Sequence, residues 1–252
     1  MGTASNRQPA AEVARIFNMM LHGCETARAA ALGCSSCLSS SPAQPLDDVR
    51  LREEELDTLD REINEAVTNE IVNCRSQLET RELLACLKAI NELERIGDLL
   101  LGFANRAGSV RQRLAEQDLH DLSLMASLLE RMLADGAEAF RKRDADLALA
   151  VLRADMEMDR LRNLLFVRHI ENPDNAPHQE SFHLVFMTQC LERAGDHAKN
   201  VVEEVVHLVT GRSVRHLLRA QDKPDEVRFL EYMRRRAPAG KSLGKQKTQG
   251  KA

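Results

Sequence analysis

The sequence predicts an all-α protein made of two tandem three-helix bundles, and three observations lead to this expectation. Hydrophobic residues make up 43% and charged residues 29% of the 252 positions, but aromatic residues only 3%. This composition is typical of long helices, whereas a β-sandwich needs more aromatic and β-branched side chains. Apolar residues also recur at steps of three and four, the period of an amphipathic helix. Finally, a hexapeptide at residues 93–98 returns at 191–196 with a single change, from Ile96 to Ala194, which indicates a duplicated unit.

The first half of the chain, residues 11–108, is expected to hold three helices. The apolar pattern predicts the first helix over 12–32. The second is expected over 48–77, where Asp47 is a good N-cap for its first turn. The third is expected over 80–108, capped by the threonine at its start and ended by the glycine at its end.

The segment between the first two helices, residues 33–45, is rich in Ser, Cys and Pro and is expected to be a loop. Its cysteines Cys34 and Cys37 form a CxxC pair, and together with Cys24 they could bind a metal ion or respond to oxidation. No second CxxC or nearby histidine pair completes a zinc site, so structural cysteines are the favoured interpretation. The other cysteines fall within helical patterns and are expected to be small buried side chains: Cys74, Cys86 and Cys190.

The second half, residues 109–218, repeats this plan. A fourth helix is expected over 118–143 and a fifth over 144–170. A loop at 171–177 that contains two prolines separates them from a sixth helix. Gly211 is placed to end that helix as its C′ residue.

Residues 219–252 form a C-terminal extension. A short helix is expected over 225–236, followed by a disordered basic tail over 238–252 with four lysines and no acid. The tail is either a solubilising terminus, which we favour, or an attachment to an anionic partner or membrane surface.

The overall charge and hydropathy exclude several classes of protein. The net charge of −4 argues against a nucleic-acid-binding protein. No stretch has the run of apolar residues that a membrane span needs, and the polar start lacks the features of a signal peptide. The expectation is therefore a cytoplasmic protein.

Pairs of acids with the spacing E/D-x-x-x-D occur in the second and third helix of each half. Residues at i and i+4 lie about 40° apart on a helix, so each pair shares one side. Like charges at this spacing are unfavourable, which a bound cation or neighbouring arginines would offset. The four pairs are Glu53 with Asp57, Glu94 with Asp98, Asp155 with Asp159, and Glu192 with Asp196.

Antiparallel neighbouring helices would bring the two pairs of each half face to face across a groove. Gln189, Asn200 and Glu203 add oxygen atoms to the side of the sixth helix that carries Glu192. Lys199 lies on the same stripe, so a salt-bridged surface explains the pattern as well as a metal site does.

An all-oxygen set of ligands selects hard cations such as Fe³⁺, Mn²⁺, Mg²⁺ or Ca²⁺, and zinc is also compatible. Oxidase chemistry at a di-iron centre needs Glu-x-x-His, but Gly97 and Gly195 stand at the histidine positions. His197 alone is more typical of a surface or packing residue. With no nucleophile–histidine arrangement, P-loop or dinucleotide-binding turn, the sequence does not predict an enzyme.

These residues resemble a known family, the PhoU regulators of phosphate signalling. Leu-Glu-Arg-Ile-Gly-Asp at 93–98 and Leu-Glu-Arg-Ala-Gly-Asp-His-Ala-Lys-Asn at 191–200 are similar to its two signature segments, and Gly-Arg-Ser-Val-Arg-His at 211–216 is similar to the segment after the second of them. The resemblance covers residues 12–218. It implies tandem three-helix bundles with multinuclear metal clusters, often of iron, at the paired acids.

Carried over by position, the resemblance assigns one set of ligands to each half. They are Glu53, Asp57, Glu94 and Asp98 in the first, and Asp155, Asp159, Glu192 and Asp196 in the second. The first half departs from the family pattern, because Leu99 and Leu100 come after its aspartate and Gly102 stands where the second half has Asn200. The second half therefore matches the family more closely.

The resemblance also implies a function. PhoU proteins are negative regulators that couple a phosphate ABC transporter to a membrane sensor histidine kinase and restrain phosphate uptake, so they reach the membrane through partners and are not usually catalysts. An alternative is an accessory partner of a sodium/phosphate or other ion transporter. A metal-dependent enzyme is the least favoured hypothesis, and homodimer formation is left open.

Overall fold

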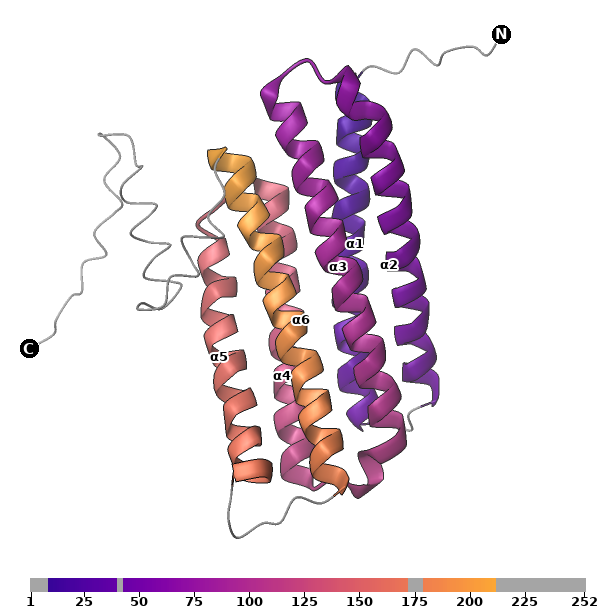
Figure 1. Ribbon diagram of the computed structural model, residues 1–252, viewed down its shortest axis with the longest axis vertical. Helices are drawn as coiled ribbons and strands as arrows, with labels where there is room; N and C mark the ends of the chain where they lie inside the picture. The colour runs from indigo at the N-terminus through magenta and orange to yellow at the C-terminus, as the bar shows by residue number, and fades with distance from the viewer. Residues whose placement is uncertain (1–8, 40–42, 172–178, 212–252) are drawn as a thin grey trace, which may run out of the picture. The chain divides into compact units, whose positions relative to one another are not determined.

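The computed structural model describes residues 9–39, 43–171 and 179–211, and within them every regular element is helical. The long helices, shown in Figure 1, are α1 (Pro9–Ser39), α2 (Ala43–Glu70), α3 (Gln77–Val110), α4 (Glu116–Lys142), α5 (Ala148–Phe166) and α6 (Gln179–Thr210). The predicted all-α class is confirmed. Residues up to Ser213 belong to one compact unit. The short helix expected at 225–236 and the basic tail lie outside the described residues.

Two three-helix bundles make up the described unit. Helices α1, α2 and α3 all contact one another, and so do α4, α5 and α6. The bundles are joined by contacts of α1 with α4 and of α3 with α6, so that α3 and α6 lie side by side in Figure 1. The buried positions step by three and four, as in α3, where Leu93, Leu100 and Phe103 are fully buried. In the described part of the chain, no helix is long and apolar enough to cross a membrane.

The loop expected at 33–45 is wrong at both ends, because α1 continues to Ser39 and α2 already begins at Ala43. Cys34, Cys37 and Leu38 continue the buried face of the helix, so the apolar period extends past the glycine that was expected to end it. Asp47 is not an N-cap either, since it lies exposed inside α2 beside Arg50. Cys34 and Cys37 are three residues apart in α1, so the CxxC spacing places both on the same buried face of the helix.

The six cysteines are all free thiols. Burial raises the pKa of the Cys24 thiol to about 12 and the pKa values of Cys37 and Cys190 to about 11. It also raises the pKa of Cys34 well above its ordinary value, and this thiol donates to the carbonyl oxygen of Leu100. Because the thiolate is the reactive and metal-binding form, these shifts support the structural interpretation of Cys24, Cys34, Cys37 and Cys190. The expectation for Cys74 is wrong, because this residue is only half-buried and lies outside the helices, after the turn that follows α2.

Three other helix boundaries in the first half differ from the expectation. Helix α2 ends at Glu70 and passes into a short 3-10 turn. Helix α3 begins after Ser76, which caps it by accepting from the Glu79 backbone N–H, while the Glu79 carboxylate accepts from the Ser76 N–H. This capping box, rather than Thr80, starts the helix. The glycine at 108 does not end it, because α3 runs on to Val110.

The last turn of the predicted fifth helix is a π-helical turn, Val167–Glu171. It is held against α4 by Arg168, whose Nη1 lies 2.9 Å from Asp118 and 2.8 Å from Asp121, and by His169, 3.0 Å from Asp118. Both aspartates are buried. Gly211 comes directly after α6 with a φ of +70° and donates to the His207 carbonyl oxygen, so its predicted role as the C′ residue is confirmed.

Candidate metal centres

The two acid pairs of the first half lie on α2 and α3, where these helices come closest. A Cβ atom at Gly97 would lie only 3.6 Å from the Cα and 3.7 Å from the Cγ of Glu53. The pKa of Glu53 is raised by burial and by the negative charges of Asp57 and Asp98. Carboxylates on the two helices thus influence one another across the groove. The contacts with Glu53 are ordinary van der Waals distances, but an added Cβ at Gly97 would lie 2.9 Å from Leu56 Cδ1, so the glycine leaves room for this leucine between α2 and α3.

Glu94 and one further acid belong to the same group. The pKa of Glu94 is raised by burial and by Asp98, Asp57 and Asp60, although Arg95 opposes the shift. Burial also raises the pKa of Asp60, which accepts a hydrogen bond of 3.0 Å from Asn64. Asp60 lines a pocket of the α2–α3 groove together with Glu94 and Arg95. Sequence reasoning missed Asp60, although it lies one helical turn after Asp57.

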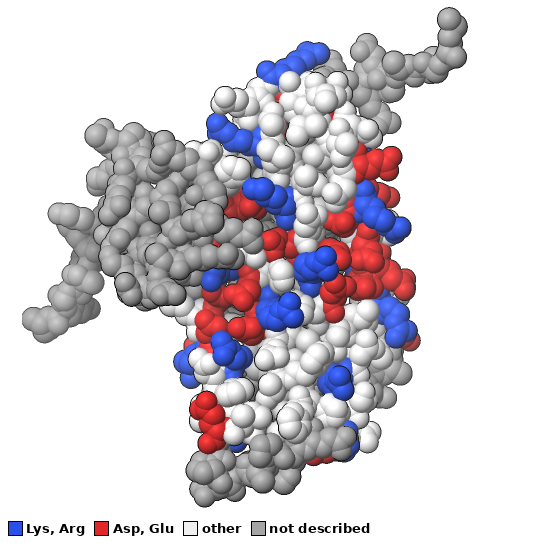
Figure 2. All heavy atoms as spheres, in the orientation of Figure 1, with Lys and Arg blue, Asp and Glu red and all other residues white. Residues whose placement is uncertain are grey.

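Arg95 is the cation paired with these first-half acids. Its Nε lies 3.2 Å from Glu94 and its Nη1 lies 3.3 Å from Asp98, but its side chain is 62% exposed. Exposed ion pairs contribute only about 0–1 kcal/mol, so Arg95 offsets little of the repulsion. Figure 2 shows the acidic side chains as a band across the middle of this face, with lysines and arginines among them.

The second-half acids also lie on facing helices, and two cations of the chain, Lys199 and Arg162, lie among them. Asp155 of α5 is only 7% exposed and accepts a hydrogen bond of 2.8 Å from Lys199 of α6. Burial raises its pKa, Lys199 opposes that shift, and Asp196 and Asp159 add to it. The predicted approach of the two pairs is therefore present, with an ammonium group between the helices.

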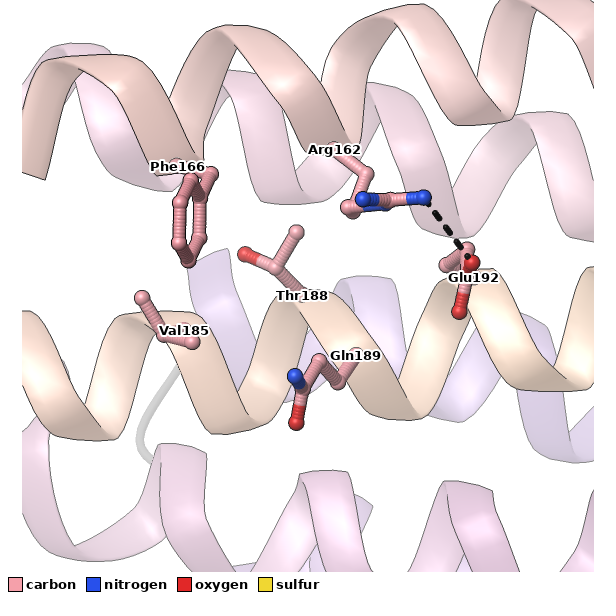
Figure 3. A pocket seen from close by; sticks show the side chains of 6 residues that line it. All are labelled: Arg162, Phe166, Val185, Thr188, Gln189 and Glu192. Carbon is pink, nitrogen blue, oxygen red and sulfur yellow. Dashed lines mark hydrogen bonds and ion pairs between the residues drawn. The ribbon is translucent and has the colours of Figure 1, made fainter. Parts of the chain in front are cut away.

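Arg162 provides the second cation of this set. Its Nη2 lies 3.4 Å from Glu192 and 3.8 Å from Asp159. Burial and Asp196 raise the pKa of Glu192, while Arg162 lowers it. Figure 3 shows the guanidinium between α5 and α6, above a pocket of about 230 Å³ lined by Arg162, Phe166, Val185, Thr188, Gln189 and Glu192.

The two additional oxygen-bearing residues have different surroundings. Asn200 donates a hydrogen bond of 2.9 Å to Glu92 of α3, and His197 lies 2.6 Å from the same carboxylate oxygen. Asn200 and His197 thereby connect the two bundles, in line with the packing interpretation of the histidine. Glu203 is buried on α6, about 20° around the helix from Glu192.

The donor chemistry of both sets suits a hard cation, but their charge balance differs. Within the described ranges, no three His, Cys, Asp or Glu side chains are grouped closely enough to hold a metal ion as they stand. The first set carries raised carboxylate pKa values and little compensating charge. Arg95 pairs with the first set only from an exposed position, whereas Lys199 and Arg162 pair with Asp155 and Glu192 in the second set.

The fold and these sites define a tandem helical-bundle protein with facing carboxylate pairs. The PhoU domain model matches residues 22–107 and 122–205, and the chain therefore belongs to the PhoU family. It is 30% identical over 175 residues to a Zymomonas mobilis protein named phosphate-specific transport system accessory protein PhoU homolog, covering 68% of this chain and 73% of that one. It is 29% identical over 177 residues to Thermotoga maritima PhoU homolog 1, covering 68% and 75%.

Two solved structures share the fold. The crystal structure of PhoU from Pseudomonas aeruginosa superposes with a TM-score of 0.73 and 24% identity, covering 81% of this chain and 100% of that chain. The phosphate transport system regulatory protein PhoU from Streptococcus pneumoniae gives a TM-score of 0.74 and 21% identity, covering 82% and 99%.

Proposed function

We propose that this PhoU-family protein is a cytoplasmic negative regulator of phosphate uptake and of phosphate-starvation signalling. In this proposal it links a phosphate ABC transporter to a membrane sensor histidine kinase and has no catalytic role. The observation that carries the proposal is the match of both halves to the PhoU domain. The names of the relatives, phosphate-specific transport system accessory proteins, support it.

Gene deletion tests this role. Without the protein, phosphate-starvation genes should be expressed and phosphate uptake should continue in rich phosphate, and the intact gene should restore repression. Genes that stay fully repressed in the deletion strain would contradict the regulatory role. An affinity purification that recovers a secondary sodium/phosphate carrier, and neither the ABC transporter nor the kinase, would favour the alternative partner.

Metal binding forms a second part of the proposal. In the first half, Glu53, Asp57, Glu94 and Asp98 would hold the metal, with iron preferred over manganese, zinc or magnesium. A bound hard cation would offset the repulsion among these carboxylates, of which Glu53 and Glu94 are half-buried and Asp57 and Asp98 are exposed, and would tie α2 to α3. In the second half, Lys199 and Arg162 would have to move aside from Asp155 and Glu192, so we propose weaker binding there. The sequence favours the second half as the metal site, so the order of affinities proposed here is the reverse.

Metal content measured by plasma mass spectrometry tests this part. The protein is purified without chelators or a metal-binding tag and then repleted with iron, manganese, zinc or magnesium. Glu53→Gln should remove most of the bound metal, and Asp196→Ala should remove the smaller share. Glu54→Gln is the matched control, because this exposed neighbour on α2 faces about 100° away from Glu53 and should leave the content unchanged. If the parent protein stays empty after repletion, the acid pairs are only a salt-bridged helix surface.

A further inference from the structure

Helix α6 carries two exposed aromatic side chains one turn apart. Phe182 is 66% exposed and Phe186 is 41% exposed. Their spacing places both on one side of the helix. Large apolar side chains that are exposed side by side are typical of interaction surfaces. Figure 2 shows few charged side chains over the C-terminal part of α3 and the N-terminal part of α6, below the acidic band.

The neighbouring helix α3 leaves space beside this aromatic ridge. A Cβ atom at Gly102 would lie 3.8 Å from Cys190 Sγ and 3.9 Å from Phe186 Cζ. The glycine therefore faces the phenylalanine ring without covering it. A larger side chain at position 102 would fill the space next to Phe186. Gly102 thus lets the Phe186 ring lie directly beside α3.

The position of Phe186 is held by contacts within the protein. The Arg106 guanidinium lies 4.9 Å from the centre of the Phe186 ring, at cation–π distance. Arg106 Nη1 also lies 3.2 Å from His183 Nδ1. A side chain that is already ordered loses little further freedom when a partner binds. Phe186 is thus a preorganised anchor.

On its other side the ridge borders the pocket between α5 and α6. Val185 lines this pocket together with Phe166, which gives an apolar wall, and Arg162 lies at the polar end, as Figure 3 shows. The Nε of Arg162 is buried and has no hydrogen-bond acceptor. The pocket can therefore take an aliphatic side chain and offers an N–H donor to an acidic group.

The charges around the ridge indicate the chemistry of a partner. Neither Arg106 nor Arg193 pairs with a carboxylate in the part of the chain that the structure describes. Arg113, which follows α3, lies 3.6 Å from Glu180, the only carboxylate paired with it among the described residues. Guanidinium groups without a carboxylate beside exposed aromatic rings favour a partner that brings both apolar side chains and carboxylates.

We propose that the surface formed by Gly102, Phe182, Val185 and Phe186, the α3–α6 strip, is the docking site for an amphipathic helix on the cytoplasmic side of the phosphate transporter. Aliphatic side chains three and four residues apart pack on the ridge and into the pocket, and a carboxylate binds Arg106. This inference rests on the proposed function, because it names the surface by which the protein contacts its transporter.

The test is binding of the full-length protein to the purified phosphate transporter from the same organism in lipid nanodiscs. The Phe182→Ala, Phe186→Ala double variant should lose about 30-fold or more in affinity, the scale of an interface hot spot. Arg106→Gln should weaken binding and reduce its dependence on salt. Leu51→Ala is the control, since Leu51 is a 60% exposed apolar side chain on α2, which forms no part of the α3–α6 strip. Circular dichroism and melting curves verify that each variant folds.

Each outcome decides a different point. If the parent protein does not bind the transporter, the proposed function is wrong and this inference is wrong with it. If the parent binds and the double variant binds equally well, the proposed function stands and the α3–α6 strip is not the docking site. Equal losses in the Leu51→Ala control would also contradict the strip. If light scattering shows that the double variant only dissociates a homodimer while transporter binding is unchanged, the strip is a self-association surface instead.

Discussion

Gly97 and Gly195 hold the same position in the two copies of the hexapeptide, but their neighbours differ. A Cβ atom at Gly97 would lie 2.9 Å from Leu56 Cδ1 and 3.6 Å from the Cα of Glu53. At Gly195 the nearest atoms belong to Met158, at 3.5 Å, and to Met132, at 3.7 Å, which are ordinary van der Waals distances. We therefore predict that replacing each glycine with alanine has opposite effects on stability.

These contacts determine the two magnitudes. Alanine inside a helix is favoured over glycine by about 0.5–1 kcal/mol. Nothing opposes this gain at Gly195, so Gly195→Ala should raise the free energy of unfolding by about that amount and Tm by about 1–2 °C. At Gly97 the fully buried Leu56 has to shift, and overpacking a filled core costs about 1–3 kcal/mol. Gly97→Ala should therefore lose about 1 kcal/mol net.

Urea unfolding monitored by circular dichroism, in the presence of a chelator, measures both changes without a contribution from metal. Gly136→Ala on α4 is the control, because its Cβ would meet Val202 at an ordinary 3.6 Å and should behave like Gly195→Ala. If Gly195→Ala destabilises the protein as much as Gly97→Ala does, the neighbours do not decide the effect and the reasoning is refuted. A Gly97→Ala variant of increased stability would mean that Leu56 repacks without cost.

Three further predictions concern the charged groups. Asp118→Ala should destabilise the protein by about 2–3 kcal/mol and speed hydrogen exchange at 167–171, because Arg168 and His169 lose a buried acceptor. Glu116→Ala, at an exposed position of the same helix, should do neither. Equal exchange rates in both variants would contradict the role of Asp118 in holding the π-helical turn against α4. Lys199→Met should cost about 3 kcal/mol at pH 7 by leaving buried Asp155 unpaired, and an unchanged urea midpoint would refute this. The pKa of Glu53 is raised in the folded state, so ionisation of this carboxyl opposes folding. The stability of the metal-free protein should therefore fall as the pH rises from the ordinary pKa of 4.5 through the raised pKa. Glu53→Gln should match the parent below that range and exceed it by about 0.5 kcal/mol at pH 7, and a difference that shrinks with rising pH would show the opposite sign.

The period of the apolar residues was sufficient to predict six helices and their pairing into two bundles. It misplaced the boundary at 33–45, because a glycine and a CxxC pair are compatible with either a loop or a buried helical face. Only the packing of Cys34 and Cys37 against other elements decides between them. It also missed the capping box at Ser76, although Glu79 three residues later is a signal that the sequence contains.

The four acid pairs lie on α2, α3, α5 and α6 as their spacing predicts, since the positions of residues i and i+4 are a local property of a helix. Their electrostatic environment is not local. The sequence could not show that Lys199 reaches Asp155 on another helix, or that Arg162 lies between Glu192 and Asp159. Asp60 of α2 influences the pKa of Glu94 on α3 because the two helices approach each other closely at Gly97.

The side-by-side packing of α3 and α6 is likewise a tertiary result. Periodicity identifies the buried face of each helix but not which helix covers it, because the hydrophobic effect has no direction. The duplicated hexapeptide, the helix period and the carboxylate spacing were therefore determined by the sequence alone. Contacts between residues 44 and 30 positions apart decided which charges are compensated, and contacts of Gly102 and Arg106 with Phe186, more than 75 positions apart, decided what lies beside this exposed ring; only the folded chain brings these residues together.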